Sequence, residues 1–184
     1  DAMPRVALIV PAYGEEATKV EEVKALGQID YPSLEIVVVN DGSKDATMEV
    51  LKKAFDLERS TLARSGAIAT QPVRGFYRSR NRPNLCVVDK KNGGKADALN
   101  AGIEATRAPL VCCIDADTIV DRQAITRLTE PFLFSEVPVV AVGGCIQIAN
   151  GSTFSDGILQ EARVARSNVA RTQALEYLRA FVFF

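Results

Sequence analysis

Short apolar runs alternate with segments of mixed polarity along the first two thirds of the chain. Each run ends at a proline, an asparagine or an acidic residue, a pattern typical of buried strands, which we expect at residues 6–10, 35–39, 85–88 and 110–114. Between them, apolar side chains at helical spacing predict helices at about residues 15–26, from Ser43 or Asp45 to 55, and after Lys95. Strands that alternate with helices predict an α/β fold, with a mostly parallel sheet and helices on both faces.

The remaining segments are less regular. Six arginines and no acidic residue lie in residues 59–82, which predicts a long basic connection with little regular structure, either functional or solvated. A helix is expected at about 121–130, ended by Pro131. Residues 137–148 predict one bent strand or two short ones, and residues 159–184 favour a helix.

Two carboxylates one residue apart follow the apolar run 110–114. Asp115 and Asp117 are expected at the carboxyl end of a strand, where open α/β sheets bind ligands. Two oxygen ligands at this spacing can turn toward one hard cation that also binds phosphates, so we expect a metal and diphosphate site here. The alternative is that Asp117 and Thr118 only start a turn or cap the next helix.

Two other strand ends carry polar groups. Asp41 follows the second strand, and we expect its carboxylate to be exposed there until a ligand binds. Gly93 and Gly94 follow the third strand and precede a helix that begins near Lys95, so backbone amides, the helix N-terminus and a lysine can approach an anion. This segment is not a P-loop, and the glycine pair alone is a weak signal.

Composition narrows the chemistry. With 184 residues and 47% apolar content the chain fits one globular domain, and its net charge of −1 argues against nucleic-acid binding. No apolar run is long enough for a membrane span, and no signal peptide is present, so the chain as given is expected to be soluble. There is no histidine, which excludes an imidazole base, and the four cysteines are expected to be reduced core residues in the cytosol.

Four motifs in order resemble the family 2 glycosyltransferases, and within them the processive synthases of poly-N-acetylglucosamine, hyaluronan, chitin and cellulose. The motifs are Val-Pro-Ala-Tyr-Gly-Glu-Glu at 10–16, Val-Val-Asn-Asp-Gly-Ser-Lys-Asp at 38–45, Asn-Gly-Gly-Lys-Ala-Asp-Ala-Leu-Asn-Ala-Gly at 92–102, and Ile-Asp-Ala-Asp-Thr at 114–118. Each is weak alone, but the order makes the set specific. Residues 173–181 extend the similarity.

The resemblance implies a GT-A (Rossmann-like) domain that binds a nucleotide-diphospho-sugar, expected to be a UDP-sugar. In that family Pro11, Ala12, Tyr13 and Glu15 would frame the nucleoside, and Asp41 would bond the uracil edge.

The family's remaining donor-site residues map to the two later motifs. Gly94 and Lys95 would lie near the nucleotide, and Asp97 would line that side of the pocket. Asp115 would face the nucleotide and donor sugar, and Asp117, with Asp115, would hold Mg²⁺ or Mn²⁺ at the diphosphate.

The sequence departs from the family in three ways. Gly14 stands where Asn is common, which should matter little because the turn tolerates glycine. There is no Trp, and the Glu-Asp and Gln-x-x-Arg-Trp motifs that carry the family's catalytic base and acceptor site are missing. We therefore expect residues 1–184 to be an incomplete, C-terminally truncated donor-binding part, with the base beyond Phe184. The whole protein would be an inverting transferase in the cell membrane, its domain cytoplasmic, adding sugar to a glycan or polysaccharide acceptor.

Three alternatives remain at this stage. A noncatalytic nucleotide-binding module would share the donor motifs. A receiver-like signalling domain also places Asp and Lys at strand ends, but its acidic pair follows the first strand, where this chain has Pro11-Ala12-Tyr13. A nucleotidyltransferase would begin with a Gly-rich basic loop, which the first turn lacks. The sequence does not identify the sugar, the acceptor or the processivity.

Overall fold

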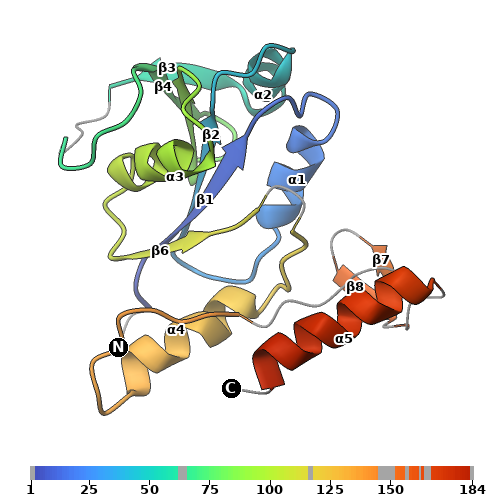
Figure 1. Ribbon diagram of the computed structural model, residues 1–184. Coiled ribbons are helices and arrows are strands. Elements are labelled where there is room, and N and C mark those ends of the chain that lie inside the picture. Colours follow the sequence, from blue (N-terminus) through green and yellow to red (C-terminus); the bar gives the residue numbers. More distant parts are fainter. Residues whose placement is uncertain are drawn as a thin grey trace. The chain divides into compact units, whose positions relative to one another are not determined.

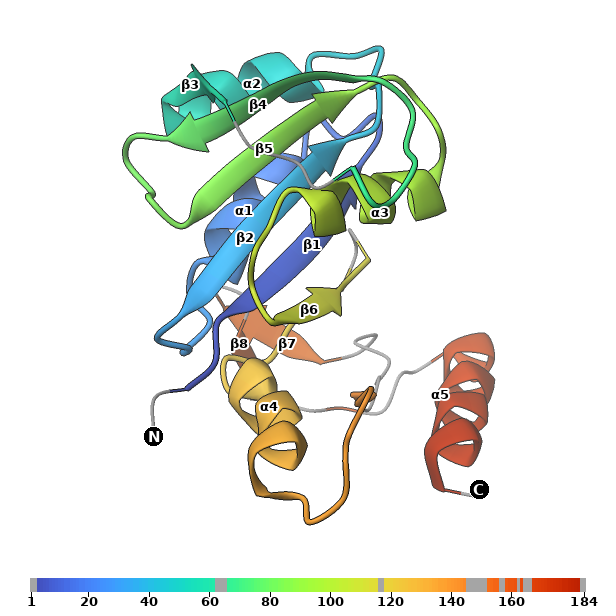
Figure 2. The ribbon, with the colours of Figure 1, turned by 90° about the vertical axis from the view of Figure 1, so that its left-hand side faces the viewer.

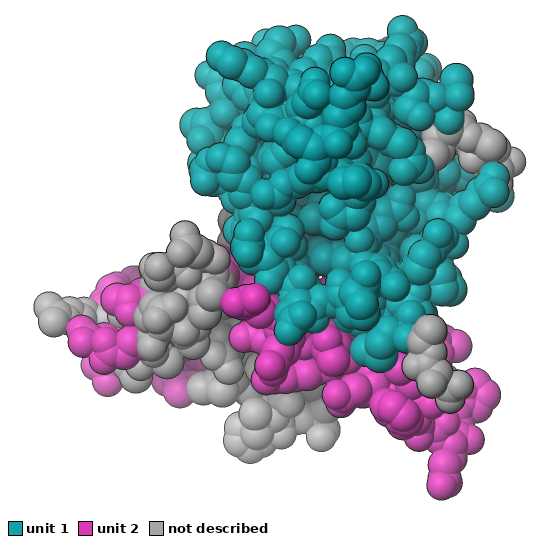
Figure 3. All heavy atoms as spheres, turned by 180° about the vertical axis from the view of Figure 1, so that it is seen from behind, with its two compact units in different colours: residues 1–118 teal, residues 119–184 magenta. Residues whose placement is uncertain are grey.

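The computed structural model describes residues 3–61, 66–115, 118–144, 152–155, 158–161, 163 and 167–182. The chain divides into two compact units, residues 1–118 and residues 119–184, which are coloured separately in Figure 3. The first unit contains the large sheet and three helices, and the second contains two helices and a two-stranded sheet.

The first unit is built on a six-stranded sheet in the order β3-β4-β5-β2-β1-β6 (Figure 2). Four of its strands are parallel: β1 (Val6–Ala12), β2 (Leu34–Asn40), β5 (Leu85–Lys90) and β6 (Leu110–Cys113). β1 pairs with β2 over its whole length, so that Val6 lies opposite Leu34 and Ala12 opposite Asn40. This confirms the α/β class with a mostly parallel sheet.

The four predicted strands are present, but the last one is less buried than expected. β1, β2 and β5 are almost entirely buried, whereas β6 alternates between half-buried and exposed residues, and Val111 is 45% exposed. The prediction of a buried strand at 110–114 is therefore wrong in this respect. β6 is an edge strand of the sheet, and within the described part of the chain it pairs with β1 alone.

The arginine-rich stretch contains two strands that the sequence did not predict. β3 (Leu57–Ser60) and β4 (Val73–Ser79) form an antiparallel pair, and β4 also pairs antiparallel with β5. Their arginines point outward or bond locally, as Arg59 does to the Arg74 carbonyl oxygen at 3.0 Å, while Phe76 packs on the core. The expectation of an irregular connection is thus wrong for these strands: β3 is an edge strand, which tolerates charged side chains, and the arginines of β4 are exposed. Residues 62–65 lie outside the described residues.

Helices cover both faces of the sheet, as predicted. α3 (Lys95–Glu104) lies on one side of β1, and α1 (Lys19–Leu26) lies on the other, the side that α2 (Thr47–Phe55) also covers (Figure 1). α1 begins four residues later than expected, because residues 16–18 form a turn in which the Lys19 amide already donates to the Glu15 carbonyl oxygen.

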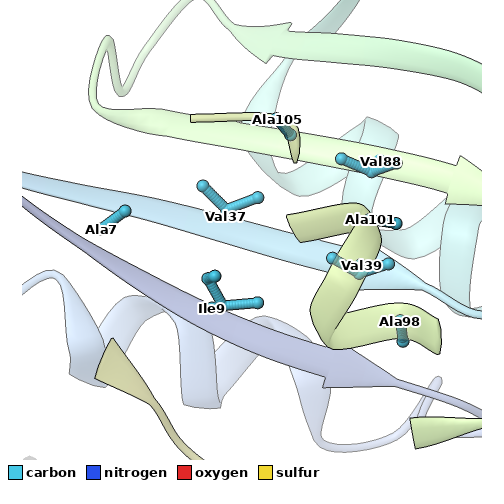
Figure 4. Packing of buried hydrophobic residues seen from close by; sticks show 8 residues of the cluster. All are labelled: Ala7, Ile9, Val37, Val39, Val88, Ala98, Ala101 and Ala105. Carbon is cyan, nitrogen blue, oxygen red and sulfur yellow. The ribbon is translucent and has the colours of Figure 1, made fainter. Parts of the chain in front are cut away.

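The core between α3 and the sheet is made of small and β-branched residues. Ile9, Val37, Val39 and Val88 point from the strands toward Ala98 and Ala101 of α3 and Ala105, the residue that follows the helix, as Figure 4 shows. Gly102 completes the contact, since a Cβ there would overlap the Ile9 side chain. Close packing therefore fixes α3, and with it the helix start at Lys95, against the sheet.

The second unit differs from the sequence-based expectation in several places. α4 spans Ala124–Phe134 and continues past Pro131, whose carbonyl oxygen accepts a hydrogen bond from the Ser135 amide at 3.2 Å. Proline removes one helical hydrogen bond but did not end the helix. Residues 137–144 contain no strand, and residues 145–148 lie outside the described part.

The C-terminal segment also begins differently from the prediction. β7 (Thr153–Ser155) and β8 (Ile158–Glu161) pair antiparallel, so the expected helix at 159–184 starts only at Asn168, as α5 (Asn168–Val182). Among the described residues, no helix combines the length and the apolar character that crossing a membrane requires.

Candidate functional site

The candidate residues lie where the parallel strands end. Because β5, β2, β1 and β6 are parallel, the loops that follow them leave the same edge of the sheet, toward which the arrowheads of β5, β2 and β1 point in Figure 2. The chain continues from β1 to β2 on one side and later returns to β6 on the other. Ligands bind at such a reversal of strand order in open α/β sheets.

Asp41 follows β2 and is the centre of a hydrogen-bonded turn. Its carboxylate accepts from Asn92 Nδ2 at 3.1 Å, from the Gly93 amide at 3.0 and 3.3 Å, and from the Gly94 amide at 2.8 Å. Asn92 Nδ2 also donates to the Asp41 carbonyl oxygen at 2.8 Å. Asp41 is only 3% exposed, so the expectation of an exposed carboxylate is wrong: the chain itself supplies its partners.

Lys90, the last residue of β5, is fully buried and lies beneath this turn. Its ammonium group lies 2.5 Å from Asp41 Oδ1, forms a second ion pair with Asp97, and donates to the Lys91 carbonyl oxygen at 2.8 Å. A buried lysine requires such partners, because an unpaired buried charge is costly. Lys90 was not expected from the sequence. The available signal was a lysine that comes directly after the apolar run 85–88 and Asp89, two residues before Asn92.

The Asn92–Gly94 turn has little room for other residues. Gly94 has φ +86°, in the region that favours glycine, and precedes the first residue of α3. Across the turn, Gly42 has φ +71°, and a Cβ there would lie 2.6 Å from the Asn92 nitrogen. The two glycines therefore allow the loops after β2 and β5 to lie against one another.

Lys95 and Asp115, predicted from two different strand ends, form an ion pair. Both side chains are open to solvent, at 62% and 55% exposure. Asp117, the other predicted metal ligand, lies outside the described residues. The structure thus brings a cation at the start of α3 and an anion at the end of β6 to one exposed place.

Hydrogen bonds connect the loop after β1 to the loop after β2 and the start of α2. The Gly14 amide donates to Ser43 Oγ at 3.1 Å and the Glu15 amide to Thr47 Oγ1 at 2.9 Å. Two more hydrogen bonds join the same loops: the Glu16 amide donates to Asp45 Oδ2 at 3.2 Å, and the Ala46 amide donates to Glu16 Oε2 at 2.7 Å. These hydrogen bonds between the two loops were not expected from the sequence.

The residues predicted to frame the nucleoside lie at the end of β1 or in the loop that follows it. Pro11 and Ala12 end β1, and the side chain of Tyr13 is 52% exposed beyond it. Glu15 instead forms an ion pair with the buried Lys19 at 2.5 Å. Tyr13 is thus the one of these side chains that is openly available to a ligand.

Asp97 connects the site to the preceding connection of the chain. Besides pairing with Lys90, its carboxylate accepts from the Gln71 amide at 2.9 and 3.2 Å. About two helical turns further along α3, the Glu104 carboxylate accepts hydrogen bonds from the Gly66 and Ile68 amides at 2.8 and 3.0 Å. Two acidic residues of α3 therefore hold residues 66–71 by their backbone.

Two of the described cysteines, Cys86 and Cys112, are poorly suited to act as thiolate ligands or nucleophiles. Burial raises the pKa of the Cys86 and Cys112 thiols to about 11, so both are protonated at neutral pH. Burial also raises the pKa of Cys113, against the opposing effect of Lys95, although this side chain is exposed rather than in the core as predicted. Cys145 lies outside the described residues.

Carboxylates are therefore the donors from which a metal site could be made. Within the described part of the chain, no group of three or more His, Cys, Asp or Glu side chains is placed to hold a metal ion. Asp115 offers one exposed set of carboxylate oxygens, which fits a hard cation such as Mg²⁺ or Mn²⁺.

Comparison with known proteins points to one family. The sequence model of "Glycosyl transferase family 2" matches residues 7–179. Poly-beta-1,6-N-acetyl-D-glucosamine synthase of Staphylococcus aureus (strain COL) is 29% identical over 154 residues, which cover 83% of this chain and 31% of that protein. The Staphylococcus epidermidis synthase is 28% identical over 128 residues, 69% of this chain and 25% of that protein. The chain thus spans less than a third of these curated relatives.

A solved structure supports the fold. Mannosyltransferase PcManGT from Pyrobaculum calidifontis, in complex with GDP-Man and Mn²⁺, matches with a TM-score of 0.56 and 24% sequence identity, covering 74% of this chain and 34% of that one.

Proposed function

The chain belongs to glycosyl transferase family 2 and has the GT-A fold, and on this basis we propose that it binds the nucleotide-sugar donor of a glycosyltransferase. Family membership replaces the alternative of a receiver-like signalling domain. The observation that carries the proposal is the exposed Lys95–Asp115 pair, which lies where the strand order reverses and next to the glycine turn that starts α3.

We propose a UDP-sugar as the donor, with UDP-N-acetylglucosamine as the first one to test. The two staphylococcal relatives, named as poly-N-acetylglucosamine synthases, support this choice. On this chain, Lys95 and the N-terminus of α3 would supply positive charge for a diphosphate, and the exposed Tyr13 side chain would contact the nucleoside. Pro11, Ala12, Glu15 and Asp97 complete the proposed donor site.

Asp41 acts differently in this proposal from the role expected from the sequence. Its carboxylate oxygens already accept hydrogen bonds from Asn92, Gly93 and Gly94 and pair with Lys90. The proposal is therefore that Asp41 shapes the turn from which Gly94 and Lys95 face the nucleotide.

Asp115 and Asp117 are the proposed ligands of Mg²⁺ or Mn²⁺. The described carboxylate, Asp115, fits because it is exposed and offers only oxygen donors, and PcManGT was solved with Mn²⁺. When bound, such a cation would offset the charge of the departing diphosphate. Lys95 neutralises Asp115 in the free chain and can turn to a phosphate oxygen when the carboxylate takes a metal.

The transfer itself is proposed to invert the anomeric carbon, with a glycan or polysaccharide as the acceptor. Inversion in a single displacement requires a general base within hydrogen-bond reach of the acceptor hydroxyl. We propose that this base and the membrane association belong to parts of the whole protein that residues 1–184 do not include, since the chain covers 25–31% of its curated relatives.

Calorimetry with and without metal tests this proposal. The 184-residue chain is titrated with UDP and UDP-N-acetylglucosamine, in EDTA and in Mn²⁺ or Mg²⁺. Metal should raise the affinity for UDP about tenfold or more, as expected for a charge-assisted contact. Asp115→Asn should lose this gain, whereas Glu21→Gln, a matched change of an exposed carboxylate on α1, should keep it. Equal affinity with and without metal would refute the metal role, and no UDP binding would refute the donor-binding function.

A further inference from the structure

Lys90 connects two segments of the chain that both meet the start of α3. One is the Asn92–Gly94 turn, whose shape is set by the Asp41 carboxylate. The other is residues 66–71, whose nearest end is held by the bond from the Gln71 amide to Asp97. The Lys90 ammonium pairs with both carboxylates.

The bridge is buried and rigidly placed. Lys90 is fully buried, Asp41 almost so, and the Asp97 side chain is 20% exposed. Leaving Lys90 or Asp41 without its charged partner in such surroundings is costly, so the ammonium group favours the arrangement in which both carboxylates lie against it. Gly93 of the turn lies directly against Asp97 and Gln71, since a Cβ on Gly93 would lie 2.6 Å from Asp97 Cγ and 2.8 Å from Gln71 Cγ.

We propose that Lys90 is a positioning residue of the nucleotide site, which holds the Asn92–Gly94 turn and residues 66–71 in one fixed arrangement through Asp41 and Asp97. This inference rests on the proposed function, because the turn is where Gly94 and Lys95 are proposed to meet the nucleotide. It makes the Arg-rich connection part of the site: residues 66–71 stay beside the turn because the bridge ties them there.

Removing the ammonium group should weaken nucleotide binding even in the folded protein. Lys90→Met keeps the length of the side chain and removes its charge, so that Asp41 and Asp97 repel one another across the turn. We expect the Kd for UDP in Mn²⁺ to rise about tenfold or more, the loss expected for a charge-assisted contact. Lys24→Met is the matched control, because it removes the same charge from an exposed ion pair with Glu21, and its Kd should equal that of the wild type.

Asp97→Asn tests the bridge without leaving a buried charge unpaired, since Lys90 retains Asp41. Amide hydrogen exchange then distinguishes coupling from a local structural effect. Gln71 loses a direct bond and should exchange faster in any case. Gly94 bonds to Asp41, not to Asp97, so faster exchange at Gly94 reports a change passed through Lys90. Lys24→Met should change neither amide.

The outcomes separate the two proposals. A wild-type chain that does not bind UDP refutes the proposed function and this inference with it. A wild type that binds UDP, with Lys90→Met binding equally well, refutes the inference alone. If Lys90→Met does not fold, Asp97→Asn decides: unchanged exchange at Gly94 overturns the bridge, and faster exchange at both Gln71 and Gly94 supports it.

Discussion

Replacing Asp41 with alanine should destabilise the first unit by about 3 kcal/mol, far more than the same change at another strand end. The substitution leaves the fully buried Lys90 ammonium with Asp97 as its remaining carboxylate partner. It also removes the acceptor for the Gly93 and Gly94 amides.

The magnitude follows from these contacts. Removing one partner of a buried ion pair typically costs about 3–5 kcal/mol. Lys90 keeps Asp97, and the turn amides are in exposed residues that water can reach, so the lower end of that range applies. Asp115→Ala is the matched control: it breaks an ion pair between two exposed side chains, which is worth at most about 1 kcal/mol.

Urea unfolding followed by pulsed labelling of the Cys86 thiol measures this difference in the first unit. Cys86 is buried near the start of β5, the strand that ends at Lys90, and peptide mass spectrometry separates its labelling from that of the other cysteines. The free energy of unfolding should fall by about 3 kcal/mol in Asp41→Ala and hardly change in Asp115→Ala. Equal stability of the two variants would show that Asp41 is an ordinary turn residue and that the buried network contributes nothing.

Three further predictions concern the turns, the acid limb of stability and the transfer reaction. Gly14→Ala should lower the free energy of unfolding by about 1 kcal/mol, because Gly14 has φ +69° and open space around it. Gly42→Ala should lower it further in the same urea assay, because its Cβ would also lie 2.6 Å from the Asn92 nitrogen. The hydrogen bond from the Thr47 hydroxyl lowers the pKa of Asp45, so this carboxylate contributes stability above its unfolded-state pKa and loses it as the pH falls through the lower folded-state value. Asp45→Asn should therefore flatten the fall in urea midpoint below about pH 4, and an unchanged slope would contradict this. With labelled UDP-N-acetylglucosamine, the whole protein should form a product of inverted anomeric configuration, whereas polymer formed by residues 1–184 alone would contradict the proposal that the base lies elsewhere.

Much of the first unit could be predicted from its sequence. The apolar runs at β1, β2 and β5 are buried on both faces, so nearly all their residues are apolar and the limits of the strands are clear. Because parallel strands end at one edge, placing Lys95 and Asp115 together required only the strand assignments.

The rest depends on contacts between distant residues. β4 was missed because its exposed arginines, Arg74 and Arg78, interrupt the apolar pattern expected of a strand, although Phe76 packs on the core. Asp41 was expected to be exposed and Lys90 was not singled out, because a charged residue at a strand end is ordinarily solvated. The ion pair between them, 49 residues apart in the sequence, accounts for their burial. Pro131 shows that a proline inside a helix is a weaker stop signal than assumed.

Paramagnetic NMR with Mn²⁺ and UDP tests most directly whether the carboxyl ends of the parallel strands bind a metal and a nucleotide diphosphate. With Mg²⁺ as the diamagnetic reference, Mn²⁺ and UDP together should broaden the amide resonances of Gly14, Gly94, Lys95 and Asp115. Resonances at the opposite ends of the strands, such as Arg5 and Leu34, should stay sharp. Broadening at those opposite ends, or none at Lys95 and Asp115, would contradict the account.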